Sequence, residues 1–227
     1  MVRSLPVIGR AMMDIVIPSA TSIGLFAVAA TLLLLTPGPA VLYIVARSVE
    51  QGRIAGLASV FGITTGTLVH VLASTLGLSA LLASSTLAFA VVKYAGAGYL
   101  IYMGVRRILK RTGTSASPLG LPKRSLGRLY RDGFIVNLLN PKTALFFLAF
   151  LPQFVDPSRG AVPFQIAFLG LLFTLMGLTS DGLYALVAGT AGVWVKRQRR
   201  YLDWERYVTG SVFIGLGVTA ALAGGRK

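Results

Sequence analysis

Residues 19–46 read SATSIGLFAVAATLLLLTPGPAVLYIVA, and no charged side chain interrupts them. A helix that crosses the hydrocarbon core of a bilayer needs about 20 mostly apolar residues. This stretch is longer than any ordinary strand, and it lacks the polar face of a helix on the surface of a soluble domain. It therefore predicts a transmembrane helix, and the sequence Thr36-Pro37-Gly38-Pro39 predicts a break within that helix.

Five further apolar stretches have the length of a membrane span. They cover residues 54–82, 87–105, 133–151, 163–195 and 207–224. A short polar sequence at residues 83–86 separates the second span from the third. The sequence therefore predicts an all-α membrane protein with six transmembrane helices.

The composition excludes several classes of protein. Hydrophobic residues make up 55% of the chain and charged residues only 13%, with a mean hydropathy of +0.74. The net charge of +15 does not indicate nucleic-acid binding, because the basic residues lie between apolar spans rather than on a soluble module. The absence of cysteine excludes disulfides, thiolate metal sites and thiol redox chemistry.

The basic residues also predict the orientation. Lys and Arg are concentrated after the first, third and fifth spans, whereas the opposite side has few of them. Loops rich in Lys and Arg stay in the cytoplasm. We therefore expect a bacterial inner-membrane protein with both termini outside and residues 1–18 as an extension on the periplasmic side. The apolar run after this extension is too long for a signal peptide, and translation could start at Met1, Met12 or Met13.

A weak internal repeat relates the two parts of the chain. Lys93-Tyr94 aligns with Arg206-Tyr207, and a similar offset places His70 opposite Asp181. The first and fourth spans both contain proline. Three spans in each half give the halves opposite topology, which is the inverted-repeat plan of many secondary transporters. We expect a first repeat at residues 19–108, a basic cytoplasmic linker at 109–132 and a second repeat at 133–227.

The two proline breaks are candidates for a binding site. Pro37 and Pro39 leave the carbonyls of Leu33 and Leu35 without their helical donors, and Pro141 does the same to the carbonyl of Asn137. Exposed backbone survives in a membrane only where it faces protein or a water-filled cavity. The candidate substrate-binding residues are Thr36, Pro37, Gly38, Pro39, Asn137, Asn140, Pro141, Lys142 and Asp181.

Two charged residues lie deep within predicted spans. Lys142 lies near the middle of the fourth span, and Asp181 is the only carboxylate deep in any span. Asp181 suits proton coupling, binding of a substrate ammonium group, or both in alternation. The alternative is a static ion pair with Lys142 or Lys93. His70 is a second candidate for proton coupling, and its alternative role is that of a hydrogen-bonded packing residue.

Other chemistry has no signal in the sequence. There is no phosphate-binding loop, no spacing of metal ligands, and no nucleophile with a base nearby. We therefore expect no enzyme activity, no metal and no cofactor, with transport driven by an ion gradient. Glycine-rich helix faces allow close packing and would permit a homodimer.

Several motifs together resemble the lysine-exporter (LysE)/RhtB family over nearly the whole chain from Met13. They are Thr36-Pro37-Gly38-Pro39, Arg47-Ser48, Gly52-Arg53-Ile54-Ala55-Gly56, Lys93-Tyr94-Ala95-Gly96-Ala97-Gly98-Tyr99-Leu100, Gly133-Phe134, Asn140-Pro141-Lys142 and Leu151-Pro152-Gln153-Phe154. The resemblance implies an exporter of amino acids or close derivatives that is driven by the proton motive force. Ala40 departs from the family, which often has Asn there.

The leading interpretation is a proton antiporter that exports an amino acid, with the substrate, protons and the bilayer as its partners. The substrate carboxylate would face Lys142, and its ammonium group would face Asp181 and the freed carbonyls. Two alternatives remain: a carrier of the same architecture for a metal ion or an organic acid, and a non-transporting scaffold. The sequence does not indicate which amino acid is exported.

Overall fold

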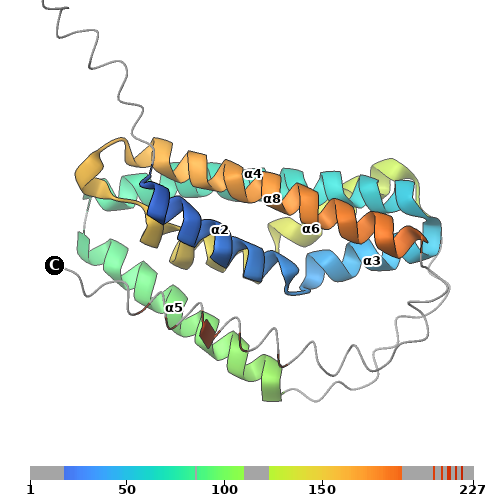
Figure 1. Cartoon of the computed structure of the whole chain (residues 1–227), viewed down its shortest axis with the longest axis horizontal. Coiled ribbons are helices and arrows are strands. Elements are labelled where there is room, and N and C mark those ends of the chain that lie inside the picture. Colours follow the sequence, from blue (N-terminus) through green and yellow to red (C-terminus); the bar gives the residue numbers. More distant parts are fainter. Residues whose placement is uncertain are drawn as a thin grey trace, which may run out of the picture.

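The computed structural model describes residues 18–84, 86–109 and 123–190, together with residues 207, 211, 214, 215, 218 and 221. All the regular structure in these residues is helical (Figure 1). Almost all of the predicted N-terminal extension, residues 110–122 of the predicted linker and most of the predicted sixth span lie outside the described residues.

Among the described residues, two helices are long and apolar enough to cross a membrane. They are α4 (Arg53–Ser84) and α8 (Val162–Thr190). Two bent pairs meet the same criterion together. The first comprises α2 (Ala20–Leu35) and α3 (Pro39–Gln51), bent by 50°, and the second comprises α6 (Leu126–Leu138) and the segment Pro141–Phe154, bent by 45°. The described residues thus form a multi-pass helical membrane protein, while six spans in a 3+3 arrangement stay a prediction.

The remaining elements are shorter or lie at the edge of the bundle. They are α5 (Thr86–Leu109), α7 (Pro141–Leu145), the π-helix η1 (Phe146–Phe150) and the 3₁₀-helices η2 (Leu151–Phe154) and η3 (Pro157–Arg159). The helix α6 begins ahead of the predicted start of the fourth span at residue 133. The other predicted span limits agree with the helices to within a few residues wherever the structure describes them.

Proline breaks both bent pairs in the same way. The helix α2 ends at Leu35, and the N–H of Thr36 turns back to the carbonyl of Leu33 at 3.1 Å. In the second pair the N–H of Asn140 donates to the carbonyl of Asn137 at 3.0 Å. A proline then occupies the first turn of the next helix, where its missing N–H has no helical partner to lose. The predicted breaks in the first and fourth spans are therefore confirmed.

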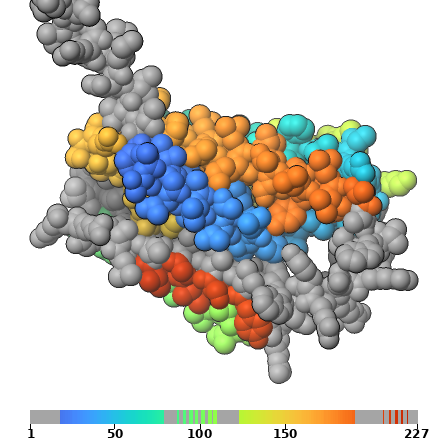
Figure 2. Space-filling model, in the orientation of Figure 1, coloured from blue at the N-terminus to red at the C-terminus, as the bar shows by residue number. Residues whose placement is uncertain are grey.

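The helices form one bundle around α4 and α8. These two long helices run side by side, α6 packs on α4, and α3 contacts both α4 and α8 (Figure 1). On one face of the molecule α2, α3 and α8 lie next to one another (Figure 2). The helix α5 lies at the edge, where it contacts η1 and α4.

The contact between α4 and α6 is close enough to require glycine on both sides. A β-carbon at Gly133 would lie 2.6 Å from the carbonyl oxygen of Ser59 in α4. In return, a β-carbon at Gly62 would collide with the carbonyl oxygen of Tyr130 in α6. Small residues let helix backbones approach in this way in membranes.

Polar and apolar side chains are distributed as a membrane requires. Leu76 and Leu175 are 65% and 62% exposed, although they belong to the two long helices. The side chains of Asn137, Lys142 and Asp181 are instead 2%, 8% and 7% exposed. In a lipid environment polar side chains face the interior of the bundle, while leucines face the acyl chains.

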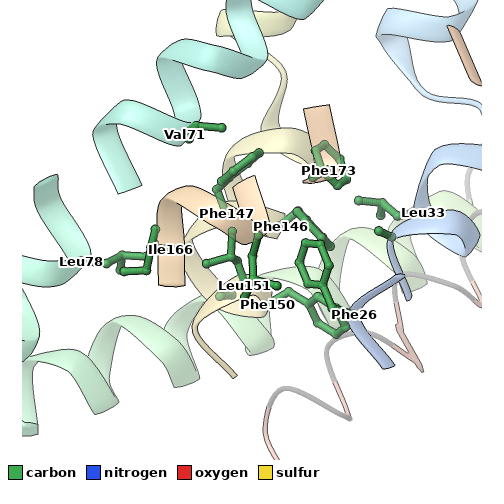
Figure 3. Packing of buried hydrophobic residues seen from close by; sticks show 13 residues of the cluster. Phe26, Leu33, Val71, Leu78, Phe146, Phe147, Phe150, Leu151, Ile166 and Phe173 are labelled. Atoms are coloured by element: carbon green, nitrogen blue, oxygen red, sulfur yellow. The ribbon is translucent and has the colours of Figure 1, made fainter. Parts of the chain in front are cut away.

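An aromatic cluster fills the end of the bundle where α2 and α8 begin. Phe146, Phe147 and Phe150 of η1 pack there against Phe26 of α2 and Phe173 of α8 (Figure 3). The ring centroids of Phe146 and Phe173 are 4.5 Å apart. Such stacked and edge-on pairs add to the stabilisation from burial alone, so this end of the bundle is densely packed.

The opposite end is basic. Gln51 and Arg124 exchange two hydrogen bonds of 2.9 and 3.0 Å, which join the end of α3 to the residues before α6. Asp132 of α6 pairs with both Arg124 and Arg131. Arg47 and Arg53 belong to the same end, since they lie beside the junction of α3 and α4.

Candidate functional site

A cavity lies between the two helix breaks, near the middle of the bundle. About 510 Å³ of atom-free space lies within it, including the part open to solvent. The lining residues are Leu33, Leu34, Gly38, Ala40, Val41, Ile63, Thr64, Thr67, Asn137, Asn140, Lys142, Thr143, Phe173, Thr174, Gly177, Leu178 and Asp181. The two broken helices and the two long helices therefore all contribute residues to one site.

Lys142 crosses from one broken helix to the other. Its ammonium nitrogen Nζ donates hydrogen bonds to the carbonyl of Leu33 at 2.7 Å and to that of Thr36 at 2.5 Å. The stem lies so close to Gly38 that an added β-carbon there would be 3.0 Å from Cδ of Lys142. The cation thus occupies the backbone oxygens at the break between α2 and α3.

Asp181 faces the same cavity from α8. Its carboxylate lies within the electrostatic influence of the Lys142 ammonium group. Gly177, one turn earlier in α8, also lines the cavity and presents no side chain. The site therefore offers one cationic and one anionic group to anything that enters it.

Asn137 holds the second break in place. Its amide nitrogen donates to the carbonyl of Ile63 and to Oγ1 of Thr67, both at 2.8 Å. Its side-chain oxygen accepts from Oγ1 of Thr143 at 3.0 Å and from the amide of Asn140 at 3.5 Å. Because these partners come from α4, from α7 and from Asn140 in the break, Asn137 fixes the break against α4.

The other freed carbonyls also have side-chain donors. Tyr184 of α8 donates its hydroxyl to the carbonyl of Leu35 at 3.1 Å. The Nε2 atom of His70 lies 3.1 Å from the carbonyl of Asn137, and its ring stacks on Phe147 with centroids 6.0 Å apart. The carbonyls that proline was predicted to free are thus bonded by side chains distant in sequence.

The structure brings together some of the predicted site residues and not others. Gly38, Asn137, Asn140, Lys142 and Asp181 line the cavity. The remaining predicted residues do not line it: Thr36 contributes a carbonyl to Lys142, Pro37, Pro39 and Pro141 shape the breaks, and His70 lies behind the second break.

Sequence reasoning missed the threonines of the cavity. The cavity is lined by Thr64, Thr67, Thr143 and Thr174. None of them is a distinctive signal in the sequence, because threonine is common in transmembrane helices. The spacing of Thr64 and Thr67, three residues apart on one face of α4, is the signal that could have indicated a polar wall. Among the described residues, no group of three His, Asp or Glu side chains is placed to hold a metal ion.

Comparison with known proteins identifies relatives over most of the chain. A homoserine/homoserine lactone efflux protein of Salmonella typhimurium (strain LT2) is 31% identical over 193 residues, which cover 85% of this chain and 92% of the relative. The protein of the same name from Salmonella typhi matches to the same extent. The membrane protein YrhP of Bacillus subtilis (strain 168) is 27% identical over 202 residues, or 86% of this chain and 95% of the relative. No solved structure matches the chain.

The family assignment follows from a match that covers a similar part of the chain. The sequence profile of the family described as LysE type translocator covers residues 31–224, which include all but the beginning of the first predicted span. The resemblance drawn from the proline, glycine and lysine motifs is therefore confirmed. The chain belongs to the LysE type translocator family, and it is a membrane transporter rather than an enzyme.

Proposed function

We propose that this transporter exports an amino acid or a close derivative from the cytoplasm in exchange for protons, with the central cavity as its substrate site. Membership of the LysE type translocator family supports efflux of an amino-acid type of compound. The relatives named as homoserine/homoserine lactone efflux proteins support a small, largely neutral substrate.

The observation that carries this proposal is that Lys142 and Asp181 both line one buried cavity. Both side chains are less than one tenth exposed, and both line the same space. Ionisable groups inside a membrane are costly, and they mark the path of a substrate or a proton. An amino acid is a zwitterion, so a site with one cation and one anion is complementary to it.

Proton coupling is assigned to Asp181, with His70 as the second candidate. A carboxylate can carry a proton across the cavity when it is exposed to one side and then to the other. Moving one charge through 100 mV releases about 2.3 kcal/mol, which corresponds to a concentration ratio of nearly fiftyfold. One proton entering for each neutral amino acid leaving is therefore sufficient for useful efflux.

We also propose an orientation of the protein in the inner membrane. The end of the bundle that carries Arg47, Arg53, Arg124 and Arg131 faces the cytoplasm, in keeping with the tendency of basic loops to remain there. Both termini then lie on the periplasmic side.

Substrate counterflow in proteoliposomes tests the proposal. Vesicles are loaded with homoserine, homoserine lactone, threonine, leucine or lysine, and labelled trace substrate is added outside. We expect one or two of these compounds to drive uptake. Asp181→Asn is expected to retain counterflow but to lose the response to a pH gradient, and Asp156→Asn, a change of the same kind outside the cavity, is expected to keep both.

The result that would overturn the proposal is an absence of counterflow for every amino acid with protein shown to be folded. Counterflow driven only by an organic acid or a metal ion would favour the carrier for another solute.

A further inference from the structure

The carbonyls of Leu33 and Thr36 form a ready site for a primary ammonium group. Pro37 has no N–H to offer the Leu33 carbonyl, and α2 ends before the Thr36 carbonyl can join its ladder. Both oxygens converge on a single nitrogen, Nζ of Lys142, at 2.7 and 2.5 Å. Backbone oxygens at the break of a transmembrane helix are suitable ligands for a cation.

The ammonium group that binds the carbonyls of Leu33 and Thr36 in the structure belongs to the protein itself. The ammonium group of Lys142 is chemically equivalent to the α-ammonium group of an amino acid, since both are primary ammonium groups with three N–H donors. Leu33 and Gly38 of the same break line the cavity, and so does Lys142 itself. A substrate in the cavity therefore lies next to oxygens that already bind its own functional group.

We propose that the α-ammonium group of the substrate displaces Lys142 from the carbonyls of Leu33 and Thr36, and that the released ammonium group of Lys142 then binds the substrate carboxylate. This inference rests on the proposed function and adds the binding mode. Lys142 thus exchanges one partner for another when substrate enters, while Asp181 lines the same cavity.

The absence of a side chain at Gly38 leaves room for the stem of Lys142. The lysine stem lies across the break, with Cδ at 3.0 Å from the position that a β-carbon of residue 38 would take. Any larger residue would press on the stem where it must turn. The flexible four-carbon chain of lysine allows its head group to move by several ångströms without a change in the backbone.

The exchange leads to different expected binding of simple amines than two simpler roles of Lys142. A lysine that only ties the two broken helices together stays at the carbonyls, so a simple amine would not inhibit counterflow by the wild-type protein. A lysine that only binds the substrate carboxylate would lower affinity for carboxylates when removed and leave affinity for simple amines unchanged. Under the exchange, removal of Lys142 vacates a site for a free amine, so affinity for a simple amine increases.

The test measures binding of n-butylammonium, which has the ammonium group but no carboxylate, to the purified protein by isothermal titration calorimetry. We expect Lys142→Met to bind n-butylammonium at least tenfold more tightly than the wild-type protein. Lys142→Arg, which keeps a tethered cation at the carbonyls, is the matched control and is expected to bind as weakly as the wild type. Tetramethylammonium, which has no N–H donor, is expected to bind to none of the three.

Equal affinity of Lys142→Met and wild type for n-butylammonium, with both proteins folded, would overturn the inference. A second measurement applies if Lys142→Met does not fold. In wild-type proteoliposomes n-butylammonium is expected to inhibit counterflow at a concentration at which tetramethylammonium does not. Equal effects of the two cations would contradict the inference.

The two proposals fail in different ways. Tight binding of n-butylammonium to Lys142→Met without amino-acid counterflow in the wild type would support the ammonium site and remove the proposed function. Counterflow without preferential amine binding would retain the function and remove the exchange at Lys142.

Discussion

Nε2 of His70 lies 3.1 Å from the carbonyl oxygen of Asn137, the oxygen that Pro141 deprives of a helical donor. A carbonyl only accepts hydrogen bonds, so Nε2 carries the hydrogen in this bond whether the ring is neutral or charged. The hydrogen bond between His70 and Asn137 can therefore persist whether or not the His70 ring takes up a proton.

This relationship leads to a prediction for two substitutions of His70. His70→Gln keeps an N–H donor, and we expect it to fold normally and to retain transport driven by a pH gradient. His70→Leu removes the donor and should lower the free energy of unfolding by about 1–3 kcal/mol, measured by thermal unfolding in detergent. Loss of the pH-gradient response in a stable His70→Gln protein would instead assign the proton to His70.

Asn137 should be among the most sensitive polar positions for stability. Asn137→Leu removes the donor to Ile63 and Thr67 and the acceptor for Thr143, all of which are within the bundle. We expect a loss of about 1–3 kcal/mol, seen as a lower midpoint of thermal unfolding. Thr67→Val, which removes a single partner of the same amide, should have a smaller effect. Equal losses for the two variants would show that the network does not act through Asn137.

Gly133 and Gly127, on the same helix α6, form a matched pair. A β-carbon at Gly133 would lie 2.6 Å from the Ser59 carbonyl, whereas one at Gly127 meets nothing within 4 Å. Gly133→Ala should destabilise the protein by about 1–3 kcal/mol through overpacking. Gly127→Ala should be neutral or stabilising by up to about 1 kcal/mol, because alanine favours the helix. Thermal shifts of the same sign and size would contradict the close contact between α4 and α6.

Ala40 is expected to affect selectivity. It lines the cavity at the start of α3, where the family often has asparagine. Ala40→Asn places an amide in the cavity, so we expect counterflow to favour homoserine over leucine about tenfold more than in the wild type, the value of one good hydrogen bond. Ala46→Asn, on the same helix but outside the cavity lining, is the control. No change in the homoserine-to-leucine ratio for Ala40→Asn would argue against the cavity as the substrate site.

Asp156 should titrate below the ordinary range of aspartate. It lies in the loop before α8, outside the spanning segments, and its Oδ1 accepts from the hydroxyl of Ser158 at 2.6 Å and from the N–H of Ser158 at 3.0 Å. These bonds hold the pKa of Asp156 below 3.8, the Ser158 hydroxyl having the largest effect. A carboxyl with a lowered pKa stabilises the folded loop above its ordinary pKa, and this stabilisation is lost as the pH falls through the folded value.

Ser158→Ala should therefore raise the pKa of Asp156 towards 3.8. The measurement is a carboxyl carbon-13 NMR titration of aspartate-labelled protein. An unchanged pKa in the variant would show that the Ser158 hydroxyl does not stabilise the carboxylate.

The local parts of this architecture could be predicted from the sequence because they depend on single residues. The missing N–H of proline is a property of that residue, so Pro37, Pro39 and Pro141 indicated both breaks and named the carbonyls that they free. The long helices α4 and α8 were predicted from their apolar length alone. The start of α6 at Leu126 could not be predicted, since charged residues such as Arg128 and Arg131 mark the end of the apolar region, whereas the helix extends beyond it.

The partners across the bundle could not be predicted in the same way. Lys142 bonds to Leu33 across 109 residues and Tyr184 to Leu35 across 149. Such pairs depend on how each helix is rotated and shifted against its neighbours, which the local pattern does not specify. The π-helix at Phe146–Phe150 has no signal either, because a run of apolar side chains is compatible with several helix types.

The reciprocal glycine contact between α4 and α6 limits how the transporter can move. The carbonyl oxygen of Tyr130 packs against Gly62, and that of Ser59 packs against Gly133. The two helix backbones therefore have no room to slide or tilt past one another. In the predicted division of the chain, α4 belongs to the first repeat, Tyr130 lies in the linker, and Gly133 begins the second repeat. A motion that moves α4 away from α6 would have to break this contact. The segments on the other side of the two breaks, such as α2 and the residues after Pro141, take no part in it.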